Sequence, residues 1–341
     1  MIMNHNIKFG ILCPSEIAFR RFLPSLKSVE GAQFAGIAIS NEQEWEGIFT
    51  NDLKKLEYQK AEKFINQYGG KIYNSYNELI TSKDIDAVYI PLPPALHYKW
   101  AKLALENNKH VFVEKPSTTK LKHTEELIEL AKEKNLVLHE NYMFQYHHQI
   151  EQINKIINSN ELGKIHSYHA RFGFPLRSEN DFRYSKALGG GALLDAGGYV
   201  VKLAILLLGP TIELVSSHLV SENGFEVDMY GTVVFKNDID QIFIGEFGMN
   251  CEYQCNLSIW GSNGILQTNR IFTAPDNFIP NAEIIKNSQI EKQNFLSDYS
   301  FQKSIQIFLK AINNENLKNQ LYKDMIIQSC FIDKIKKGKI L

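Results

Sequence analysis

Three side chains in this sequence have types and surroundings that suit acid–base chemistry at an alcohol or ketone carbon, and the first is Lys115. It follows the apolar run 110–113, which has the pattern of a buried strand, and Pro116 comes directly after it. Proline fixes the local backbone, and a cis bond before it would direct the lysine into a cleft. An ammonium group there stabilises negative charge on a substrate oxygen. We predict that Lys115 is catalytic; the alternative is a surface lysine that only follows a strand.

The other two side chains, Asp195 and Tyr199, lie in the glycine-rich segment 189–199. We expect a flexible turn that leads into a helix, on which residues four apart share one face. A nearby ammonium group lowers the pKa of a phenol, which suits a tyrosine that exchanges a proton with a carbinol. We predict this role for Tyr199. The alternatives are half-buried packing for the tyrosine and a helix-terminal charge for Asp195.

A nucleotide-binding loop is expected where the first strand, 7–12, meets the first helix. The fingerprint of such a loop has glycines at 13 and 15 and a small residue at 18, because the backbone approaches a pyrophosphate. Only Ala18 fits this pattern. A serine can still donate to phosphate through its hydroxyl and its N–H, whereas a glutamate is unfavourable unless it points outward. The predicted cofactor contacts in this loop are Cys13, Ser15, Glu16 and Ile17.

The end of the second strand determines whether such a site prefers NAD or NADP. An acidic residue there binds the ribose 2′-hydroxyl of NAD, and an arginine accepts the 2′-phosphate of NADP. The sequence has Ser40 and Asn41 at this place, so it has neither signal. We include Ser40 in the cofactor site and leave both cofactors open.

The elements that must hold these residues follow two different patterns. Up to about residue 140, strands alternate with helices, which predicts a doubly wound parallel sheet with right-handed crossovers. Strands are expected at 7–12, 34–40, 71–73, 87–90, 110–113 and 137–139, and helices at 16–26, 45–68, 76–80, 96–107 and 121–134. After that, strands at 165–174, 212–220, 228–235, 241–247 and 254–260 predict an antiparallel sheet, with helices at 150–158, 301–312 and 321–335. We therefore predict an α/β chain with a Rossmann domain over 1–140 and an α+β domain over 141–341.

Composition narrows the class of protein. The 341 residues carry a net charge of −1, so no strong field favours nucleic acid or an anionic membrane as a partner. The four cysteines form neither a CxxC pair nor a set with zinc-ligand spacing, so we predict reduced thiols and no metal site. No signal-peptide pattern is present, and the apolar stretch 200–208 is too short to span a bilayer. A cytoplasmic location is the expectation.

Taken together, the motifs resemble the Gfo/Idh/MocA family of oxidoreductases. The resemblance extends over nearly the whole chain, because the order and separation of the motifs match jointly. The matching pieces are the segment 87–93 followed by His97, the tripeptide Glu114-Lys115-Pro116, and the segment 189–199 that closes at Gly209.

The resemblance implies a Rossmann domain joined to an α/β domain whose open sheet often forms dimers or tetramers. It implies that Lys115 is catalytic or orients the substrate, and that Asp195 binds the substrate. Where many members have histidine, this chain has Tyr199, as in the subset that includes glucose–fructose oxidoreductase, dihydrodiol dehydrogenase and sugar ketoreductases. The residues placed near the nicotinamide end of the cofactor are Pro91, Leu92, His97, Glu114, Lys115 and Pro116. Some positions depart from the family. Pro94 stands where asparagine is common, and Gln145 stands where arginine is frequent. Cys13 and Ser15 stand at the positions of the lost glycines.

The resulting hypothesis is an NAD(P)-dependent oxidoreductase. It transfers a hydride between a nicotinamide and a carbon of a sugar, a nucleotide-linked sugar or a polyol. Arg171 and Arg183 are further candidates for binding sugar hydroxyls or a phosphate. The alternatives are a non-catalytic regulator that senses the dinucleotide, and a scaffold that has lost dinucleotide binding. The presence of Lys115, Asp195 and Tyr199 together favours the enzyme.

Overall fold

The computed structural model describes residues 6–45 and 49–338, which form two compact units. The first unit extends to Asn141 and also includes Phe301–Ile326. The second unit comprises Tyr142–Ser300 and resumes at Ile327. A single boundary near residue 140 therefore does not describe the chain, because a late segment returns to the first unit. No helix in the described residues is long and apolar enough to cross a membrane.

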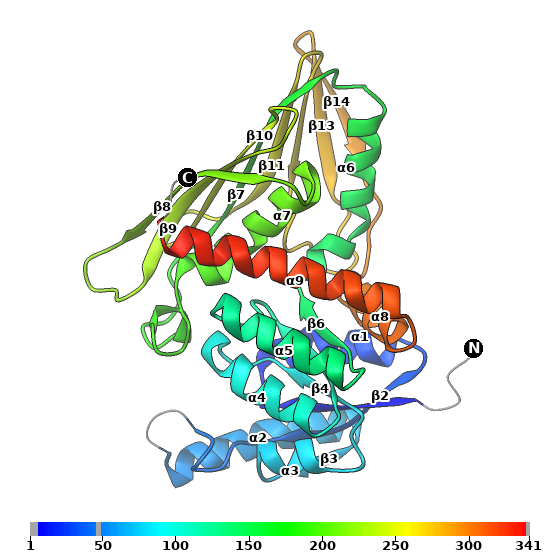
Figure 1. Cartoon of the computed structure of the whole chain (residues 1–341), viewed down its shortest axis with the longest axis vertical. Helices are drawn as coiled ribbons and strands as arrows, with labels where there is room; N and C mark the ends of the chain where they lie inside the picture. The colour runs from blue at the N-terminus through cyan, green and yellow to red at the C-terminus, as the bar shows by residue number, and fades with distance from the viewer. Residues whose placement is uncertain (1–5, 46–48, 339–341) are drawn as a thin grey trace. The chain divides into compact units, whose positions relative to one another are not determined.

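The first unit is built on a six-stranded sheet in the order β3-β2-β1-β4-β5-β6 (Figure 1). All of its neighbouring strands run parallel, as expected for strands joined by helical crossovers. The order reverses between β1 and β4, which marks the switch point where ligands of such sheets bind. The strands are β1 Ile7–Leu12, β2 Ala32–Ala38, β3 Lys71–Tyr73, β4 Ala87–Ile90, β5 His110–Glu114 and β6 Leu138–Asn141.

Helices cover both faces of this sheet, which explains why its strands are apolar throughout. One face packs against α3 Tyr76–Thr81, α4 Pro94–Glu106 and α5 Leu121–Glu133. The other packs against the π-helical turn Ala18–Phe22, which leads into α1 Leu23–Lys27, and against α8 Ser300–Ile312, through tilted and edge-on aromatic rings. The helix α2 Asn51–Tyr68 packs beside the same π-helical turn, where Phe64 contacts Phe19.

Two predicted helices of this unit differ in detail. The single helix expected at 16–26 is present over 16–27, and it contains a π-helical turn, Ala18–Phe22, ahead of α1. The helix expected at 45–68 begins at Asn51, because the Thr50 side chain accepts the N–H of Leu53 and caps it. Residues 46–48 of that prediction lie outside the described residues.

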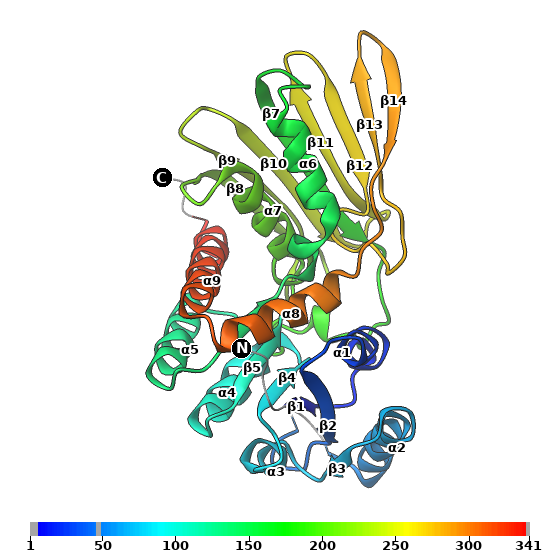
Figure 2. The same ribbon diagram turned by 90° about the vertical axis from the view of Figure 1, so that its right-hand side faces the viewer.

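The second unit contains an eight-stranded sheet in the order β14-β13-β12-β11-β7-β10-β9-β8 (Figure 2). Its neighbours are antiparallel except for β7 and β10. Three strands were not predicted: β12, β13 and β14. All six residues of β14 are exposed, so it lacks the apolar alternation that signals a strand. The strands are β7 Ile165–Phe174, β8 Glu213–Ser221, β9 Asp228–Lys236, β10 Ile242–Met249, β11 Gln254–Gly261, β12 Ile265–Asn269, β13 Asn281–Lys286 and β14 Gln289–Asn294.

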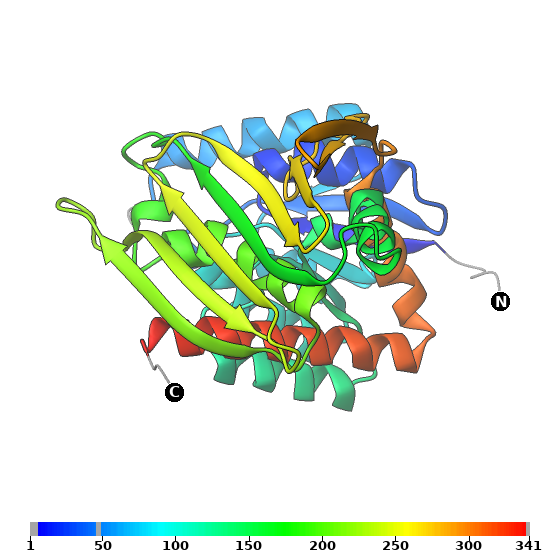
Figure 3. The same ribbon diagram turned by 90° about the horizontal axis from the view of Figure 1, so that it is seen from above.

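One face of this sheet carries the core of the second unit. The helices α6 His148–Asn158, α7 Gly198–Leu208 and the end of α9 Glu315–Lys336 contribute buried side chains to the same apolar cluster as the strands. In the described part of the unit, no helix lies over the opposite face of β7, β10 and β11 (Figure 3). Along β7 the inward residues Tyr168, Ala170 and Phe172 are buried, and the residues between them face outward.

Candidate active site

The carboxyl ends of β1 and β4 meet at the switch point of the first sheet. The Cys13 sulfur lies 3.8 Å from the carbonyl oxygen of Pro91, which follows β4. Cys13 has a φ of 67°, a left-handed conformation that costs little only for glycine. The backbone therefore retains the shape of a glycine-rich loop although the glycine itself is absent.

The helix after this loop begins as a phosphate-binding helix would. The Ser15 hydroxyl oxygen accepts the N–H of Ala18 at 3.3 Å. Glu16 is exposed and pairs with Arg20 at 3.4 Å, which directs its charge outward as the prediction required. A cavity of about 560 Å³ beside the loop is lined by Ser15, Glu16, Arg20, Lys60 and Lys63, among others, so cations outnumber acids in it.

The residues that follow β2 are held by local hydrogen bonds. The strand ends at Ala38, two residues earlier than predicted, and Ser40 is buried. The Asn41 side-chain oxygen accepts the N–H groups of Gln43 and Glu44. The Glu44 carboxylate accepts three backbone N–H groups, those of Asn41, Tyr76 and Asn77, at 3.1, 2.9 and 3.0 Å. Glu44 therefore stabilises the start of α3 and is not available as the acid that binds an NAD ribose.

Lys115 lies directly after β5 at the same edge, and its peptide bond to Pro116 is cis. The preceding residue, Glu114, is buried, and its Oε1 accepts hydrogen bonds from the Tyr89 hydroxyl and the Asn141 amide, both at 2.8 Å. Burial raises the pKa of Glu114, while these two donors and Lys115 act against the increase. Glu114 thus holds β5 to its neighbours β4 and β6 beside the lysine.

His97 connects the loops that follow β4 and β5. It is fully buried in α4, with Nδ1 2.7 Å from the carbonyl oxygen of Pro116 and Nε2 2.7 Å from that of Leu92. Burial lowers its pKa to about 4, although both carbonyls favour the charged form. The ring thus links the two loops and acts as a brace behind the Lys-Pro turn.

We expect the protein to lose stability in mild acid because of two buried histidines. Burial lowers the pKa of His97 and of His110 to about 4, against about 6.5 in an unfolded chain. The native state therefore binds fewer protons, so stability falls as the pH decreases from about 6.5 to about 4, by up to about 3 kcal/mol for each ring. Urea unfolding at a series of pH values measures this slope.

A matched variant isolates one of the two rings. His110 Nδ1 accepts the N–H of Val137 at 3.0 Å, and an asparagine oxygen can accept the same N–H. His110→Asn should therefore reduce the acid dependence by about half. An unchanged slope would contradict the assignment.

The predicted turn that leads into a helix is present, and two glycines of this second motif are required by close packing. A Cβ on Gly190 would lie 2.3 Å from the carbonyl oxygen of Arg183, and one on Gly191 would lie 2.4 Å from the Asp228 carboxylate. Gly191 also has a φ of 113°. The same Asp228 carboxylate accepts the N–H of Leu193 at 2.6 Å, which fixes the start of the following π-helical turn Leu193–Gly197.

Asp195, in that π-helical turn, is held by Arg183. The Arg183 Nε donates to Asp195 at 2.7 Å, and its Nη1 donates to Asp181 at 3.0 Å. The side chains of Arg183, Asp181 and Asp195 are only 20%, 15% and 13% exposed, so the three form a partly buried cluster. Arg183 therefore uses its charge on two carboxylates and fixes Asp195, which makes it an unsuitable ligand for a substrate phosphate.

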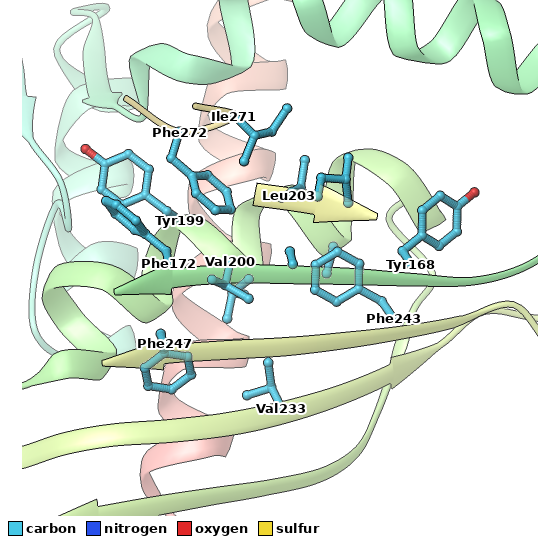
Figure 4. Close-up of a cluster of buried hydrophobic side chains, with 14 of the residues drawn as sticks. Tyr168, Phe172, Tyr199, Val200, Leu203, Val233, Phe243, Phe247, Ile271 and Phe272 are labelled. Atoms are coloured by element: carbon cyan, nitrogen blue, oxygen red, sulfur yellow. The ribbon is translucent and has the colours of Figure 1, made fainter. Parts of the chain in front are cut away.

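Tyr199 follows at the start of α7, inside a cage of aromatic rings. Its ring centre lies 5.3 Å from that of Tyr142, 5.2 Å from Phe172 and 5.9 Å from Phe272. Figure 4 shows its hydroxyl at the edge of this cluster, directed away from the apolar side chains. The packing fixes the ring of Tyr199 and keeps its polar end out of the core.

Arg171 does not join this group. It is exposed on β7, between the buried residues Ala170 and Phe172, and therefore projects from the opposite face of the sheet. Its Nε donates to Glu246 at 2.5 Å, and Glu246 also contacts His169. The prediction that Arg171 binds substrate is wrong, because Asp195 and Tyr199 belong to the helical segment on the other face.

The structure thus gathers the predicted residues into two sets. In the first unit, the loops after β1, β4 and β5 hold Cys13, Pro91, Leu92, His97 and the Glu114-Lys115-Pro116 tripeptide. In the second unit, one helical segment holds Asp195 and Tyr199. Sequence reasoning missed the supporting polar residues. Four of them contact the site from distant parts of the chain without any short-range spacing, and they are Tyr89, Asn141, Asp228 and Ser304. The fifth, Asp181, lies two residues before Arg183.

Both parts of the chain match known families. Residues 31–142 match an oxidoreductase family with an NAD-binding Rossmann fold, and residues 150–267 match the Gfo/Idh/MocA C-terminal domain. The chain is 32% identical over 332 residues to the dTDP-3,4-didehydro-2,6-dideoxy-alpha-D-glucose 3-reductase of Actinomadura kijaniata, which corresponds to 97% of this chain and 95% of that protein.

Solved structures show the same similarity. A 3-ketoreductase from Actinomadura kijaniata, in complex with NADP and TDP-benzene, superposes with a TM-score of 0.90 at 32% identity, over 98% of both chains. More distantly, the D-xylose 1-dehydrogenase (NADP(+)) 2 of Haloferax volcanii is 25% identical over 89% of this chain and 88% of its own length.

Proposed function

We propose that this protein reduces the 3-keto group of a dTDP-linked deoxysugar with NADPH. It is a member of the Gfo/Idh/MocA family of NAD(P)-dependent oxidoreductases, which act on CH–OH or keto groups. The predicted family and the predicted class of enzyme are both confirmed. The proposal adds the substrate, the cofactor preference and the residues. Its basis is the similarity over nearly the full length to a reductase of this kind, together with the retained Lys115 and Tyr199.

One observation supports these two residues in particular. The related ketoreductase has been crystallised with a lysine replaced by alanine or glutamate and with a tyrosine replaced by phenylalanine. The altered lysine and tyrosine of that protein are separated by the same number of residues as Lys115 and Tyr199 here. This equal separation supports the assignment of Lys115 and Tyr199 as the corresponding pair.

The proposed mechanism assigns one role to each side chain. Tyr199 donates its phenolic proton to the ketone oxygen, and the Lys115 ammonium stabilises the charge that develops on that oxygen. Asp195, fixed by Arg183, accepts a hydrogen bond from a sugar hydroxyl. Bound NADPH supplies the hydride, so the ketone gains one hydride and one proton and becomes an alcohol. The left-handed backbone of Cys13 and the Ser15 hydroxyl at the start of the following helix fit the pyrophosphate of such a dinucleotide.

A direct assay tests this function. Purified protein is mixed with NADPH and a dTDP-linked 3-keto-deoxysugar, and loss of NADPH absorbance and appearance of the 3-hydroxy product are measured. We expect turnover with the nucleotide-linked sugar and much slower turnover with the free sugar. Binding of NADPH without turnover of any keto sugar would instead favour the alternative of a dinucleotide-sensing regulator.

The preference for NADPH gives a second prediction. Glu44, which follows the end of β2, is held by three backbone N–H groups and so does not serve as the acid that binds an NAD ribose. Asn41→Asp keeps the oxygen that accepts from Gln43 and Glu44 and adds a negative charge. We expect it to weaken NADPH binding about tenfold and leave NADH binding nearly unchanged. Fluorescence titration with both cofactors measures the ratio, and equal losses for both would contradict the proposal.

We also propose that the protein is a cytoplasmic homodimer or homotetramer that assembles through the uncovered face of the second sheet. Large apolar side chains are exposed on this face: Tyr230, Ile242, Ile244 and Trp260 are 45%, 42%, 38% and 59% exposed. Patches of this kind mark association sites. All four cysteines are free thiols, which suits a reducing compartment.

Ile244→Lys tests this assembly. Ile244 lies beside His169 and Val234 in the middle of the exposed face, so a charge there should split the oligomer. Sedimentation velocity should show a smaller species for the variant, whereas Ile290→Lys, on the edge strand β14, should leave the assembly intact. A wild-type protein that sediments as a monomer would contradict the proposal.

A further inference from the structure

A buried chain of hydrogen bonds connects a C-terminal helix to the residue that precedes Lys115. Ser304, in α8, is fully buried, and its hydroxyl donates to the Asn141 Oδ1 at 2.8 Å. The Asn141 amide nitrogen then donates to Glu114 Oε1 at 2.8 Å. At the other end of this series of hydrogen bonds, His139 Nε2 lies 2.8 Å from the Ser304 oxygen. All of these groups belong to the first unit.

The direction of each hydrogen bond follows from the donors available. An amide oxygen cannot donate, so the single hydroxyl hydrogen of Ser304 is used on Asn141. Ser304 must then accept from His139, which places the imidazole hydrogen on Nε2. Asn141 is thereby fixed with its NH₂ group toward Glu114, and Tyr89 donates to the same carboxylate oxygen. Both of these side-chain donors, the Asn141 amide and the Tyr89 hydroxyl, point toward Glu114. They match an ionised carboxylate, which only accepts hydrogen bonds, better than a carboxylic acid, which must also donate one.

The reverse orientation of Asn141 would have the opposite effect. Its oxygen would then face Glu114, which could form a hydrogen bond only if it carried a proton. That orientation would also require the Ser304 hydroxyl to turn toward His139 and the imidazole hydrogen to move from Nε2 to Nδ1. The donation from Ser304 to Asn141 therefore reinforces the orientation in which the NH₂ group of Asn141 meets Glu114.

We propose that Ser304 is a positioning residue: acting through Asn141, it keeps Glu114 ionised and fixed as the counter-charge adjoining the catalytic Lys115. The inference rests on the proposed role of Lys115. A fixed negative charge next to the ammonium holds the ammonium in one place, which matters because displacement of a catalytic group by about 1 Å can cost about 100-fold in rate. The titratable groups around Glu114 are Lys115 on its own strand, Tyr89 on β4 and, beyond Asn141 and Ser304, His139 on β6.

Ser304 is not needed to attach α8 to the sheet. Phe301 and Phe308 of the same helix contact Phe112, and Phe308 also contacts Phe9. Ile305 is buried beside them. Aromatic and aliphatic packing of this size holds the helix without the hydroxyl, so the polar contact has a different role.

Four variants test the proposal: Ser304→Ala, Ser304→Thr, Ile305→Val and the double variant Ser304→Ala with Glu114→Gln. Ser304→Ala should lower kcat about tenfold and leave the KM for the sugar and the Kd for NADPH within about twofold. Ser304→Thr, which restores a hydroxyl, should recover most of the rate. Ile305→Val removes a buried methyl group from the same helix and should lower the melting temperature without lowering kcat.

Infrared difference spectra of the cofactor-free protein test the charge of Glu114 directly. In mild acid, Ser304→Ala should show the carbonyl stretch of a protonated carboxyl group that is absent from the wild type and from the double variant. Absence of this band, or equal losses of kcat in Ser304→Ala and Ile305→Val, would overturn the proposal. The spectra need no substrate, so a wild type that reduces no keto sugar overturns the proposed function while the band still decides the role of Ser304.

Discussion

Replacing Lys115 with methionine should lower kcat about 300-fold with only a small change in the KM for the sugar. Methionine has a similar length and no charge, so the variant removes the ammonium group and little else. Loss of one preorganised group that stabilises a developing oxyanion typically costs about 100- to 1,000-fold in kcat. The interaction is strongest in the transition state, which is why the effect should fall on kcat. Steady-state oxidation of NADPH in the presence of the keto sugar measures both parameters.

Two controls accompany the Lys115 variant. Lys120→Met removes an exposed lysine five residues later and should keep the wild-type rate. NADPH titration should give nearly the same Kd for both variants, because Lys115 is proposed to act on the substrate oxygen. If Lys115→Met retained the wild-type kcat, the assignment of this residue would be wrong, even though the protein reduced the keto sugar.

Tyr199→Phe should lower kcat by a similar factor, about 100- to 1,000-fold, while leaving the fold intact. The substitution keeps the ring that packs against Tyr142, Phe172 and Phe272 and removes only the hydroxyl. Proton transfer by a positioned side chain contributes about 100- to 10,000-fold to a rate. The melting temperature should therefore stay close to that of the wild type, while the kcat measured with NADPH and the keto sugar falls.

A second buried tyrosine of the same unit provides the matched control. Burial raises the pKa of Tyr168 to about 12, so its phenol stays protonated throughout the useful pH range. Figure 4 shows its hydroxyl directed away from the Tyr199 end of the cluster. Tyr168→Phe should retain full activity, and equal losses in the two tyrosine variants would point to packing rather than proton transfer. The double variant Lys115→Met with Tyr199→Phe should lose less than the product of the single losses, because both groups are proposed to act on one oxygen.

The alternating architecture of the first unit could be predicted because its signals are local. Short apolar runs separated by amphipathic segments indicate parallel strands and crossover helices, and all six strands of this sheet were expected within a few residues of their observed bounds. The large, mostly antiparallel second sheet was expected for the same reason, although three of its strands were missed. The polar, exposed residues of β14 gave no pattern that could have identified it.

The candidate site was predictable only in part. Lys115 could be located because a strand followed by Lys-Pro places that residue at the carboxyl edge of the sheet, and the structure has it there. Arg171 was misplaced, because a strand pattern shows that neighbours face opposite sides but not which side a distant helix will cover. Arg183 and Asp195 were both selected, yet their ion pair depends on a tight loop that spacing alone does not reveal.

The sequence by itself determined the class of fold, the family and the identity of the residues that can do chemistry, because these depend on short-range periodicity and on motifs of a few residues. Only the tertiary structure decided what holds those residues in place. Ser304 reaches Asn141, and Tyr89 reaches Glu114, across wide separations in sequence. Such contacts form because buried polar groups must find partners wherever packing brings them together. The pattern of residues along the sequence does not show which partner each group will have.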